Sequence, residues 1–552
     1  MMTTLQERIH ALTPEQHKKL AQVAQVQRAR HRRCDKEVDV AILGGGLAGL
    51  TLARQLRRER SDLNILVLEK SSYPAPEAAH KVGESTVELG SHYLREVLGL
   101  TDHLEECQLI KVGLRYYFPA GDNSDVARRV ELGSTIIPPV PSHQIDRGRF
   151  ENMLWAQNQQ DEIECWDNCS VRQVDLNETG HIVTVHRDDS SETIRARWVV
   201  DAASRASILK RQLGLAEAVD HRAGAVWFRI DDKIDIDDWS TDSAWRGRVP
   251  EGMRWLGTNH LMDRGYWVWL IPLAGDVTSV GIVADSNLHP HNEMNRFDRA
   301  LDWLRRHEPQ CADAVEDRQH LLQDFRVLKQ YAYSCQRVFS SQRWCLTGEA
   351  GVFSDPFYSP GTDFISMSNG LVTDLILRDL SGEAIESRVE FYNQSYLNTF
   401  ESFLTTYTDQ YALMGNPHVM INKIAWDWAA YWGVTALLYF HNNKLFDPEW
   451  AISMRDELRR FNVLYTDMQR FFHQWRDATP EPWNDQFINI LSFAHMEELH
   501  LGLEANLDDQ ALKRQLRDNI ALLESLADGC QTHGAMRRVN GDYSLRELAL
   551  AA

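Results

Sequence analysis

Two tryptophans stand two residues apart in the stretch GYWVWLIPL, residues 265–273, and a proline follows them. In a β-strand, residues i and i+2 project to the same side of the sheet. Trp267 and Trp269 are therefore predicted to form one aromatic wall, and Pro272 is predicted to end or edge the strand. Such a wall is either plain core, the commoner place for a tryptophan, or the lining of a channel that keeps reactive chemistry away from water.

A glycine-rich stretch adds a nucleotide-binding signal. In VDVAILGGGLAGLTLARQL, residues 38–56, glycines at 44, 46 and 49 separate an apolar, β-branched run from a helical pattern. In this G-x-G-x-x-G spacing, the first glycine permits a tight turn, the second lets a pyrophosphate approach the backbone, and the third packs helix on strand. The next apolar run ends in a glutamate twenty residues past the third glycine, where a carboxylate can bind a ribose hydroxyl. The predicted dinucleotide site comprises Gly44, Gly46, Leu47, Ala48, Gly49 and Glu69.

The elements that must position these residues come from distant parts of the chain. The pattern of strand, turn and helix recurs at 195–214 and at 343–370, so the dinucleotide-binding domain is predicted to be discontinuous. Runs at 223–230 and 277–284 predict antiparallel neighbours of the tryptophan strand, and the chain from about 386 onward has a helical pattern. The predicted fold class is α/β: a discontinuous Rossmann-type domain with an inserted antiparallel β-sheet substrate domain and a C-terminal helical region.

The N-terminal segment predicts a helix of its own. Thr13 can act as its N-cap with Pro14 at the first helical position, and a cluster of arginines ends it. We expect a solvated appendage, and the alternative is a docking helix for a partner protein. The predicted regions are an N-terminal helical extension at 1–36, the dinucleotide domain at 37–115, 145–215 and 325–385, the β-rich substrate domain at 116–144 and 216–324, and the C-terminal helical region at 386–552.

The composition argues against several other functions. A net charge of −20 disfavours binding to nucleic acid or to anionic membrane surfaces. The eight cysteines are scattered, and no histidine cluster accompanies the closest pair, Cys165 and Cys169, so no metal site is expected. The N-terminus has no apolar signal core, and the apolar run at 428–440 is too short to cross a bilayer. We therefore expect a soluble, cytoplasmic protein of 552 residues with no membrane partner.

Three further segments resemble the FAD-dependent monooxygenase superfamily. IDRGRFENML, residues 145–154, is similar to its D-R-x-x-F element, which implies that Arg147 lies near the flavin. VVDAASR, residues 199–205, is similar to the segment that returns the chain to the cofactor. GEAGVFSDP, residues 348–356, resembles the G-D-A segment that binds the ribityl and pyrophosphate groups, with Glu349 where aspartate is usual. The resemblance implies an FAD cofactor, bound in part by Glu349 and Asp355.

Within this superfamily, W-x-W-x-I-P is the motif of the flavin-dependent halogenases, of which the tryptophan halogenases are members. The resemblance implies that Trp267, Trp269, Ile271 and Pro272 border a tunnel between flavin and substrate. VGEST, residues 82–86, resembles the family's loop near the flavin and adds Glu84 to the cofactor site. IKVGLRYYF, residues 110–118, resembles the segment with the family's essential lysine, which assigns that role to Lys111, with Lys81 as the alternative.

The family's halide and substrate segment differs in this chain. Tryptophan halogenases have Glu-Ser-Thr-Gly where this chain has Tyr358, Ser359, Pro360 and Gly361, which argues against free tryptophan handled in their usual way. Their halide binds backbone N–H groups of the Thr-Gly pair, and proline has none, so Gly361 and Thr362 are the halide candidates. Tyr358, Trp428 and Trp432 are the predicted substrate contacts, because aromatic side chains bind flat rings well.

The resemblance also implies a reaction. Reduced FAD and O₂ form a C4a-hydroperoxide, a bound chloride, bromide or iodide takes its oxygen as hypohalous acid, and the lysine guides the halogen to an electron-rich aromatic such as a phenol or indole. No second G-x-G-x-x-G occurs in the chain, so a separate flavin reductase is the expected source of reduced FAD. The alternatives are an aromatic hydroxylase that uses no halide and a flavin-binding scaffold without turnover.

Overall fold

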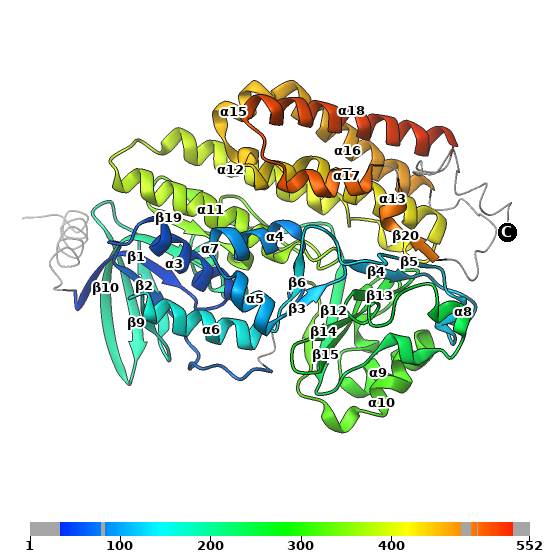
Figure 1. Cartoon of the computed structure of the whole chain (residues 1–552). Helices are drawn as coiled ribbons and strands as arrows, with labels where there is room; N and C mark the ends of the chain where they lie inside the picture. Colours follow the sequence, from blue (N-terminus) through cyan, green and yellow to red (C-terminus); the bar gives the residue numbers. More distant parts are fainter. Residues whose placement is uncertain (1–33, 79–82, 476–486, 494, 534–552) are drawn as a thin grey trace, which may run out of the picture.

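The computed structural model describes residues 34–78, 83–475, 487–493 and 495–533. The predicted N-terminal helix and Lys81 lie outside the described residues. Figure 1 shows two sheets side by side, with long C-terminal helices lying across both of them.

The first sheet is built on parallel strands from distant parts of the chain. Its order is β18-β19-β10-β1-β2-β7, and the pairs β19·β10, β10·β1, β1·β2 and β2·β7 are all parallel. All four residues of β2 are buried, because helices α3, α6 and α11 pack around the sheet. The bounds are β1 Lys36–Leu43, β2 Ile65–Leu68, β7 Glu164–Trp166, β8 Ser170–Asp175, β9 His181–Arg187, β10 Ser190–Asp201, β18 Phe339–Ser340, β19 Trp344–Leu346, α3 Leu47–Glu59, α6 Arg147–Gln160 and α11 Gly361–Leu380. The predicted discontinuous Rossmann-type fold is confirmed.

The second sheet contains the tryptophan strand. Its order is β16-β12-β15-β14-β13-β4-β5-β20, and the predicted antiparallel neighbours β12, β15 and β14 pair as expected. The bounds are β4 Leu114–Tyr117, β5 Glu131–Gly133, β12 Ala223–Ile230, β13 Thr258–Asp263, β14 Tyr266–Leu273, β15 Val277–Asp285, β16 Arg326–Leu328 and β20 Phe487–Asn489. Pairing of β14 with β13 stops at Leu270, so Pro272 lies where only β15 is a partner. β20 comes from the part predicted to be helical, so that region is not purely helical.

The two faces of the second sheet are covered differently. Even-numbered side chains such as Tyr266 and Val268 join a core with α9 (Phe297–His307) and α10 (Pro309–Glu316). Odd-numbered side chains such as Trp267 and Trp269 join the core of the C-terminal helices on the opposite face. This alternation turns both tryptophans toward the C-terminal region.

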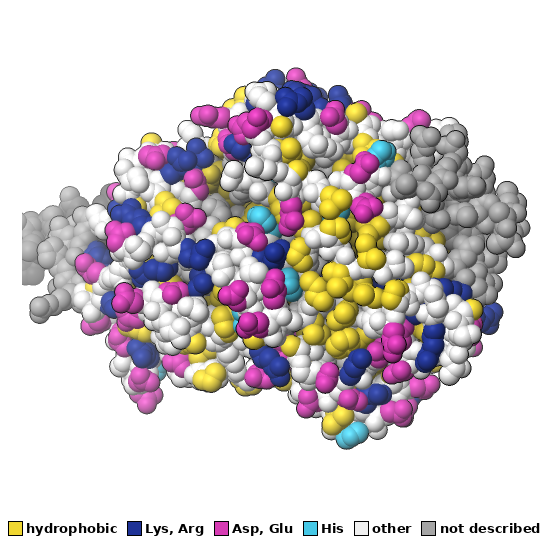
Figure 2. Space-filling model, in the orientation of Figure 1, with side chains coloured by type: hydrophobic (Ala, Val, Ile, Leu, Met, Phe, Trp, Pro, Cys, Tyr) yellow, Lys and Arg dark blue, Asp and Glu magenta, His cyan; other side chains and the backbone are white. Residues whose placement is uncertain are grey.

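The C-terminal region forms the helical layer over the two sheets (Figure 1). Its helices are α12 Glu386–Thr405, α13 Pro417–Ala430, the π-helical segment η9 Tyr431–Ala436, α14 Leu437–Phe440, α15 Pro448–Ser453, α16 Arg455–Trp475, α17 Met496–Leu501 and α18 Asp509–His533. Among the described residues, no helix is long and apolar enough to cross a membrane. Figure 2 shows acidic and basic side chains interspersed on the visible face, with hydrophobic ones gathered near its middle. The residue limits proposed for the separate domains stay a prediction.

Candidate active site

The turn between β1 and α3 has the close approaches that its glycine pattern predicts. Gly44 has φ +122°, in the left-handed region, and a Cβ there would lie 2.5 Å from the carbonyl oxygen of Ala202. A Cβ on Gly49 would lie 2.0 Å from the carbonyl oxygen of Gly44, whereas a Cβ on Gly46 would meet no heavy atom within 4 Å. Gly46 precedes the first residue of α3, so open space remains at a helix N-terminus, where a pyrophosphate is stabilised.

The first residues of α3 connect this turn to other segments. The N–H of Leu47 donates a hydrogen bond to Glu151 Oε1 over 3.1 Å, which joins the turn to α6. Ala48 lies against the segment 348–356, because a Cβ on Gly348 would be 3.0 Å from the Ala48 Cβ. The predicted flavin segments therefore meet at the N-terminus of α3, and this arrangement fits a dinucleotide cofactor.

Two glutamates predicted to bind the cofactor are held in place by protein donors. Glu69 follows β2, and its Oε2 and Oε1 accept hydrogen bonds from the N–H groups of Gly45 and Ser71, each at 2.8 Å. Glu349 Oε2 accepts a hydrogen bond from Ser204 Oγ at 2.6 Å. Both carboxylates are thus oriented by the chain itself.

Segments far apart in the sequence surround one cavity with about 920 Å³ of unfilled space, which we call the cofactor cavity. They are the loop after residue 82, the start of α6, the tryptophan strand and the segment from 348 into α11. The predicted site residues that line it are Glu84, Arg147, Trp267, Trp269, Ile271, Glu349, Asp355, Gly361 and Thr362. The structure therefore brings together residues assigned to the flavin, the tunnel and the halide.

One residue of the W-x-W-x-I-P motif lies elsewhere. Trp267, Trp269 and Ile271 are odd-numbered and face the cofactor cavity. Pro272 is not part of this lining, and strand alternation turns it toward the opposite face, where α9 and α10 pack. Three of the four motif residues thus line this cavity, and their place beside a tunnel stays a prediction.

Hydrogen bonds hold both indoles in place. Trp267 Nε1 donates to the hydroxyl of Tyr411 at 3.0 Å, and Trp269 Nε1 donates to Ser279 Oγ at 3.1 Å. The two ring centroids are 5.7 Å apart. A Cβ on Gly281, the partner of Trp269 across β14 and β15, would lie 2.2 Å from the indole. The position of the Trp269 indole therefore requires that residue 281 on the neighbouring strand has no side chain.

Ion pairs occupy the predicted cofactor residues Glu84 and Arg147. Glu84 is buried against the guanidinium of Arg229. Burial raises the pKa of Glu84, and the positive charge of Arg229 opposes this shift. Arg147 Nε donates to Glu151 Oε1 at 3.0 Å, one turn further along α6. These pairs fix the loop after residue 82 and the start of α6 at the edge of the cofactor cavity.

Asp355, which its motif assigns to the cofactor, is the centre of a buried cluster whose other side chains no sequence motif identified. Its Oδ2 accepts hydrogen bonds from His221 Nε2 at 2.6 Å, from the hydroxyl of Tyr331 at 2.6 Å and from that of Tyr411 at 2.7 Å. Its Oδ1 accepts from the N–H of Phe357 at 2.8 Å. The Asp355 carboxylate thus anchors the loop before α11 and, through Tyr411, connects this loop to Trp267.

The predicted halide residues begin a long helix. Pro360 is the N-cap of α11, and Gly361 and Thr362 are its first two residues. First-turn N–H groups have no partner within their helix, and the helix dipole favours an anion there. A Cβ on Gly361 would meet no heavy atom within 4 Å. This geometry suits a halide even though Pro360 offers no N–H.

A second cavity, with about 760 Å³ of unfilled space, adjoins the first at Pro360, which lines both. We call it the substrate cavity. It brings together the predicted lysine, Lys111, and the predicted substrate contacts Tyr358, Trp428 and Trp432. Trp432 belongs to the π-helical segment η9, a geometry that is frequent at functional sites.

Lys111 ends the short strand β3 (Leu109–Lys111), and its Nζ donates to the carbonyl oxygen of Thr86 at 2.6 Å. Burial lowers its pKa from 10.5 to about 7. Asp363 lines the same cavity, and burial raises the pKa of its carboxyl from 3.8 to about 8. Near neutral pH, a fraction of Lys111 is therefore a neutral amine inside an enclosed space.

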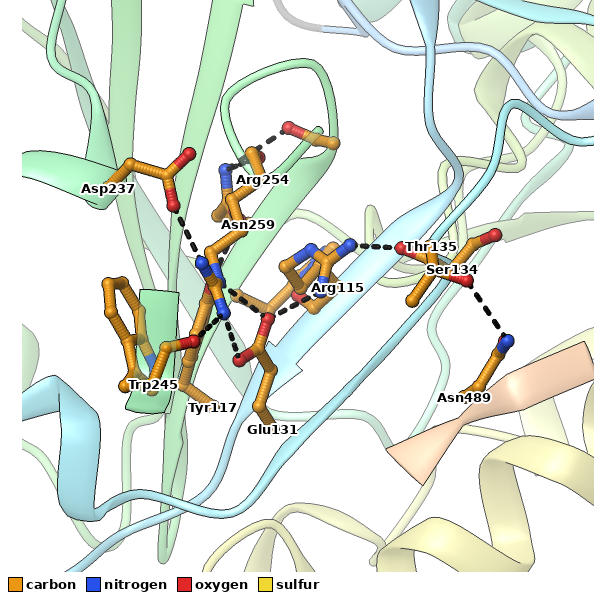
Figure 3. A network of polar contacts seen from close by, with 12 residues as sticks. Arg115, Tyr117, Glu131, Ser134, Thr135, Asp237, Trp245, Arg254, Asn259 and Asn489 are labelled. Carbon is orange, nitrogen blue, oxygen red and sulfur yellow. Dashed lines mark hydrogen bonds and ion pairs between the residues drawn. The ribbon is translucent and has the colours of Figure 1, made fainter. Parts of the chain in front are cut away.

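A buried ion network holds the strand that follows Lys111 (Figure 3). Arg115 on β4 and Arg254 both pair with Glu131 on β5, and all three residues are 0% exposed. Arg254 also pairs with Asp237 at 2.7 Å. The backbone bends at positive φ (+65°) on Gly113, between β3 and β4. Because β4 is anchored, this bend sets where Lys111 enters the substrate cavity.

Several known proteins are similar to this chain in sequence or in fold. The family model described as FAD binding domain matches residues 37–280. The flavin-dependent halogenase chlA of Dictyostelium discoideum is 23% identical over 511 residues, which are 83% of this chain and 83% of that protein. Tetracycline 7-halogenase of Kitasatospora aureofaciens is 27% identical over 369 residues, 60% of this chain and 61% of that protein. The crystal structure of halogenase PltM in complex with phloroglucinol and FAD matches with a TM-score of 0.62 at 17% identity, over 88% of this chain and 96% of that one.

The discontinuous Rossmann-type sheet, the glycine turn and the cofactor cavity define an FAD-dependent oxidoreductase. The chain is similar to flavin-dependent halogenases in sequence and, over most of its length, in fold. The protein is an FAD-dependent halogenase.

Proposed function

We propose that this enzyme installs chlorine, bromine or iodine on an electron-rich aromatic ring held in the substrate cavity, with Lys111 carrying or orienting the halogen. The observation that supports this most directly is the pair of cavities that adjoin at Pro360. One contains the tryptophan wall and the halide candidates, and the other contains the lysine. A small oxidised halogen species formed in the first cavity would pass beside Pro360 into the second, away from bulk water.

The cofactor side of the reaction uses the residues around the glycine turn. The turn that Gly44, Gly46 and Gly49 form would bind the pyrophosphate of FAD, with its closest approach at Gly46, and Glu69 would bind the ribose. When bound and reduced, FAD would reduce O₂ to the peroxide level, and this oxidant would convert the halide to hypohalous acid. We propose that a separate flavin reductase delivers this reduced FAD, since the chain has a single G-x-G-x-x-G pattern. The N–H groups of Gly361 and Thr362 would hold the halide beside the cofactor.

Lys111 can act in either of two protonation states. As a neutral amine it takes the halogen from hypohalous acid, forming an N–halogen bond and releasing water. As an ammonium group it donates a hydrogen bond to hypohalous acid and orients it over the ring. Its depressed pKa makes both forms available near neutral pH. Trp428 and Trp432 would hold the flat substrate by stacked and edge-to-face contacts.

Replacing Lys111 by alanine tests this proposal. The variant should retain FAD and oxidise reduced flavin as the wild type does, while halogenated product falls by orders of magnitude. Lys111→Arg should restore little, because the bulky guanidinium is not deprotonated. Products are measured as halide-dependent mass shifts, with chloride, bromide and iodide in parallel. Near wild-type halogenation by Lys111→Ala would refute the assignment, and Lys81→Ala then becomes the variant to test.

An aromatic hydroxylase is the second candidate, and Pro360 is the observation that favours it. Its missing N–H leaves the halide one donor fewer than the family's Thr-Gly pair provides. A product that gains oxygen and no halogen, at a rate independent of halide, would support hydroxylation instead.

A further inference from the structure

Tyr358, which stands where tryptophan halogenases have a glutamate, belongs to a buried hydrogen-bond network. The hydroxyl of Tyr358 donates to Asp427 Oδ2 at 2.9 Å, and both residues line the substrate cavity. Asp427 Oδ2 also accepts from Lys423 Nζ at 2.9 Å, and its Oδ1 accepts from Gln469 Nε2 at 2.7 Å. Asp427, Lys423 and Gln469 are 4%, 1% and 3% exposed. The Asp427 carboxylate is therefore held in place by the Lys423 cation and the Gln469 amide.

This arrangement determines what the Tyr358 hydroxyl can offer a ligand. A phenolic hydroxyl has one hydrogen, and that of Tyr358 points to Asp427, so its oxygen can accept a hydrogen bond from the cavity. Donation to an ionised carboxylate polarises the hydroxyl and strengthens its oxygen as an acceptor. Burial and the charge of Asp427 raise the pKa of Tyr358 well above 10, so the side chain stays an intact phenol.

The other carboxylates of the cavity already accept protein donors. Asp363 accepts from the N–H of Gly90 and from the hydroxyl of Tyr431, both at 2.8 Å. Glu88 accepts from His500 Nε2 at 3.2 Å. Tyr358, whose hydrogen is committed and whose ring is only partly buried, is thus well placed to recognise a donor on the substrate.

We propose that Tyr358, positioned by Asp427 and Lys423, accepts a hydrogen bond from a hydroxyl on the aromatic ring, so that this halogenase selects phenols over indoles and pyrroles. The inference rests on the proposed function and names its substrate class. A phenolic hydroxyl, with an ordinary pKa near 10, is far more acidic than the ring N–H of an indole or pyrrole, and it is therefore the stronger hydrogen-bond donor to the Tyr358 oxygen. A phenol that donates to a polarised acceptor also gains electron density at its ortho and para carbons, where an electrophilic halogen attacks.

Tyr358→Phe removes the hydroxyl and keeps the ring, so it tests the proposal directly. The probes are resorcinol, its dimethyl ether 1,3-dimethoxybenzene, and indole, each with reduced FAD and bromide. The wild type should prefer resorcinol, and in Tyr358→Phe its kcat/KM for resorcinol should fall roughly ten- to hundredfold, while that for the ether stays unchanged. Binding of resorcinol without turnover, followed by tryptophan fluorescence, should weaken in parallel.

Matched variants separate recognition from stability. Tyr392→Phe removes a comparable Tyr–Asp hydrogen bond, 2.7 Å to Asp374, outside both cavities, and should leave the preference intact. The double variant Asp427→Asn/Lys423→Gln removes both buried charges together, and should reduce the preference for resorcinol over the ether while FAD content stays at wild-type level. Unchanged preference in Tyr358→Phe, with halogenated product still formed, would overturn this inference alone. No halogenated product from any probe would instead overturn the proposed function.

Discussion

Replacing Gly281 by alanine should displace the indole of Trp269 from the wall of the cofactor cavity. Gly281 lies opposite Trp269 across β14 and β15, and a Cβ there would lie 2.2 to 2.4 Å from three atoms of the indole. Contacts this short do not occur between carbon atoms, so the ring must shift or the strands must separate. A shifted ring also loses the geometry of its 3.1 Å hydrogen bond to Ser279.

The loss of unfolding free energy can be estimated from this crowding. Overpacking a well-filled core costs about 1–3 kcal/mol, and replacing glycine by alanine returns about 0.4–1 kcal/mol through the unfolded chain. Taking the middle of each range, the net loss for Gly281→Ala is about 1.3 kcal/mol of unfolding free energy. Trp269→Ala removes the ring that the new methyl group would strike, at a cost of about 3–5 kcal/mol. In the double variant the clash is absent, so its loss should be smaller than the sum of the single losses by about 1–3 kcal/mol.

Urea unfolding of the three variants, followed by circular dichroism, measures this coupling. Gly502→Ala is the control, because a Cβ at Gly502 meets no heavy atom within 4 Å. In turnover, Gly281→Ala should release more hydrogen peroxide per halogenated product, since the tryptophan wall is displaced while the glycine turn is untouched. Strictly additive losses, or a Gly281→Ala protein as stable as the wild type, would refute the reasoning.

Four further outcomes can be checked. Gly46→Val should yield protein without bound flavin, because its side chain fills the open space at the N-terminus of α3; a purified variant with a stoichiometric flavin spectrum would contradict this. If the neutral amine of Lys111 carries the halogen, the halogenation rate should rise with pH through about 7, and a falling rate would favour the ammonium form. Because the unfolded chain keeps Lys111 protonated up to about 10.5, stability should also rise between pH 7 and 10.5, less so in Lys111→Met. Glu131→Gln leaves Arg115 buried with a neutral partner, while Arg254 keeps its pair with Asp237, and should lose about 3–5 kcal/mol of unfolding free energy; a shift below 1 kcal/mol in urea would contradict the network's role.

The sequence by itself determined the features that depend on local spacing. The glycines at 44, 46 and 49 required a tight turn between a strand and a helix, and the structure has that turn with Gly44 at positive φ. Alternation in the tryptophan strand placed Trp267 and Trp269 on one face, and the register of β14 keeps them there. Such features follow from backbone geometry over a few residues, because side-chain direction has a fixed period in a strand. The same rule turns Pro272 toward the other face of the strand.

Only the tertiary structure decided which distant groups meet. Asp427 lies behind Tyr358 because α13 packs against the loop before α11, and no spacing in the chain relates two residues so far apart. His221 and Tyr411 converge on Asp355 from separate regions, each without a motif of its own. These contacts arise from how the helical layer seats on the two sheets, where close packing and the need to pair every buried polar group select one arrangement. That selection acts on the whole assembled core, and therefore leaves no periodic trace in the sequence.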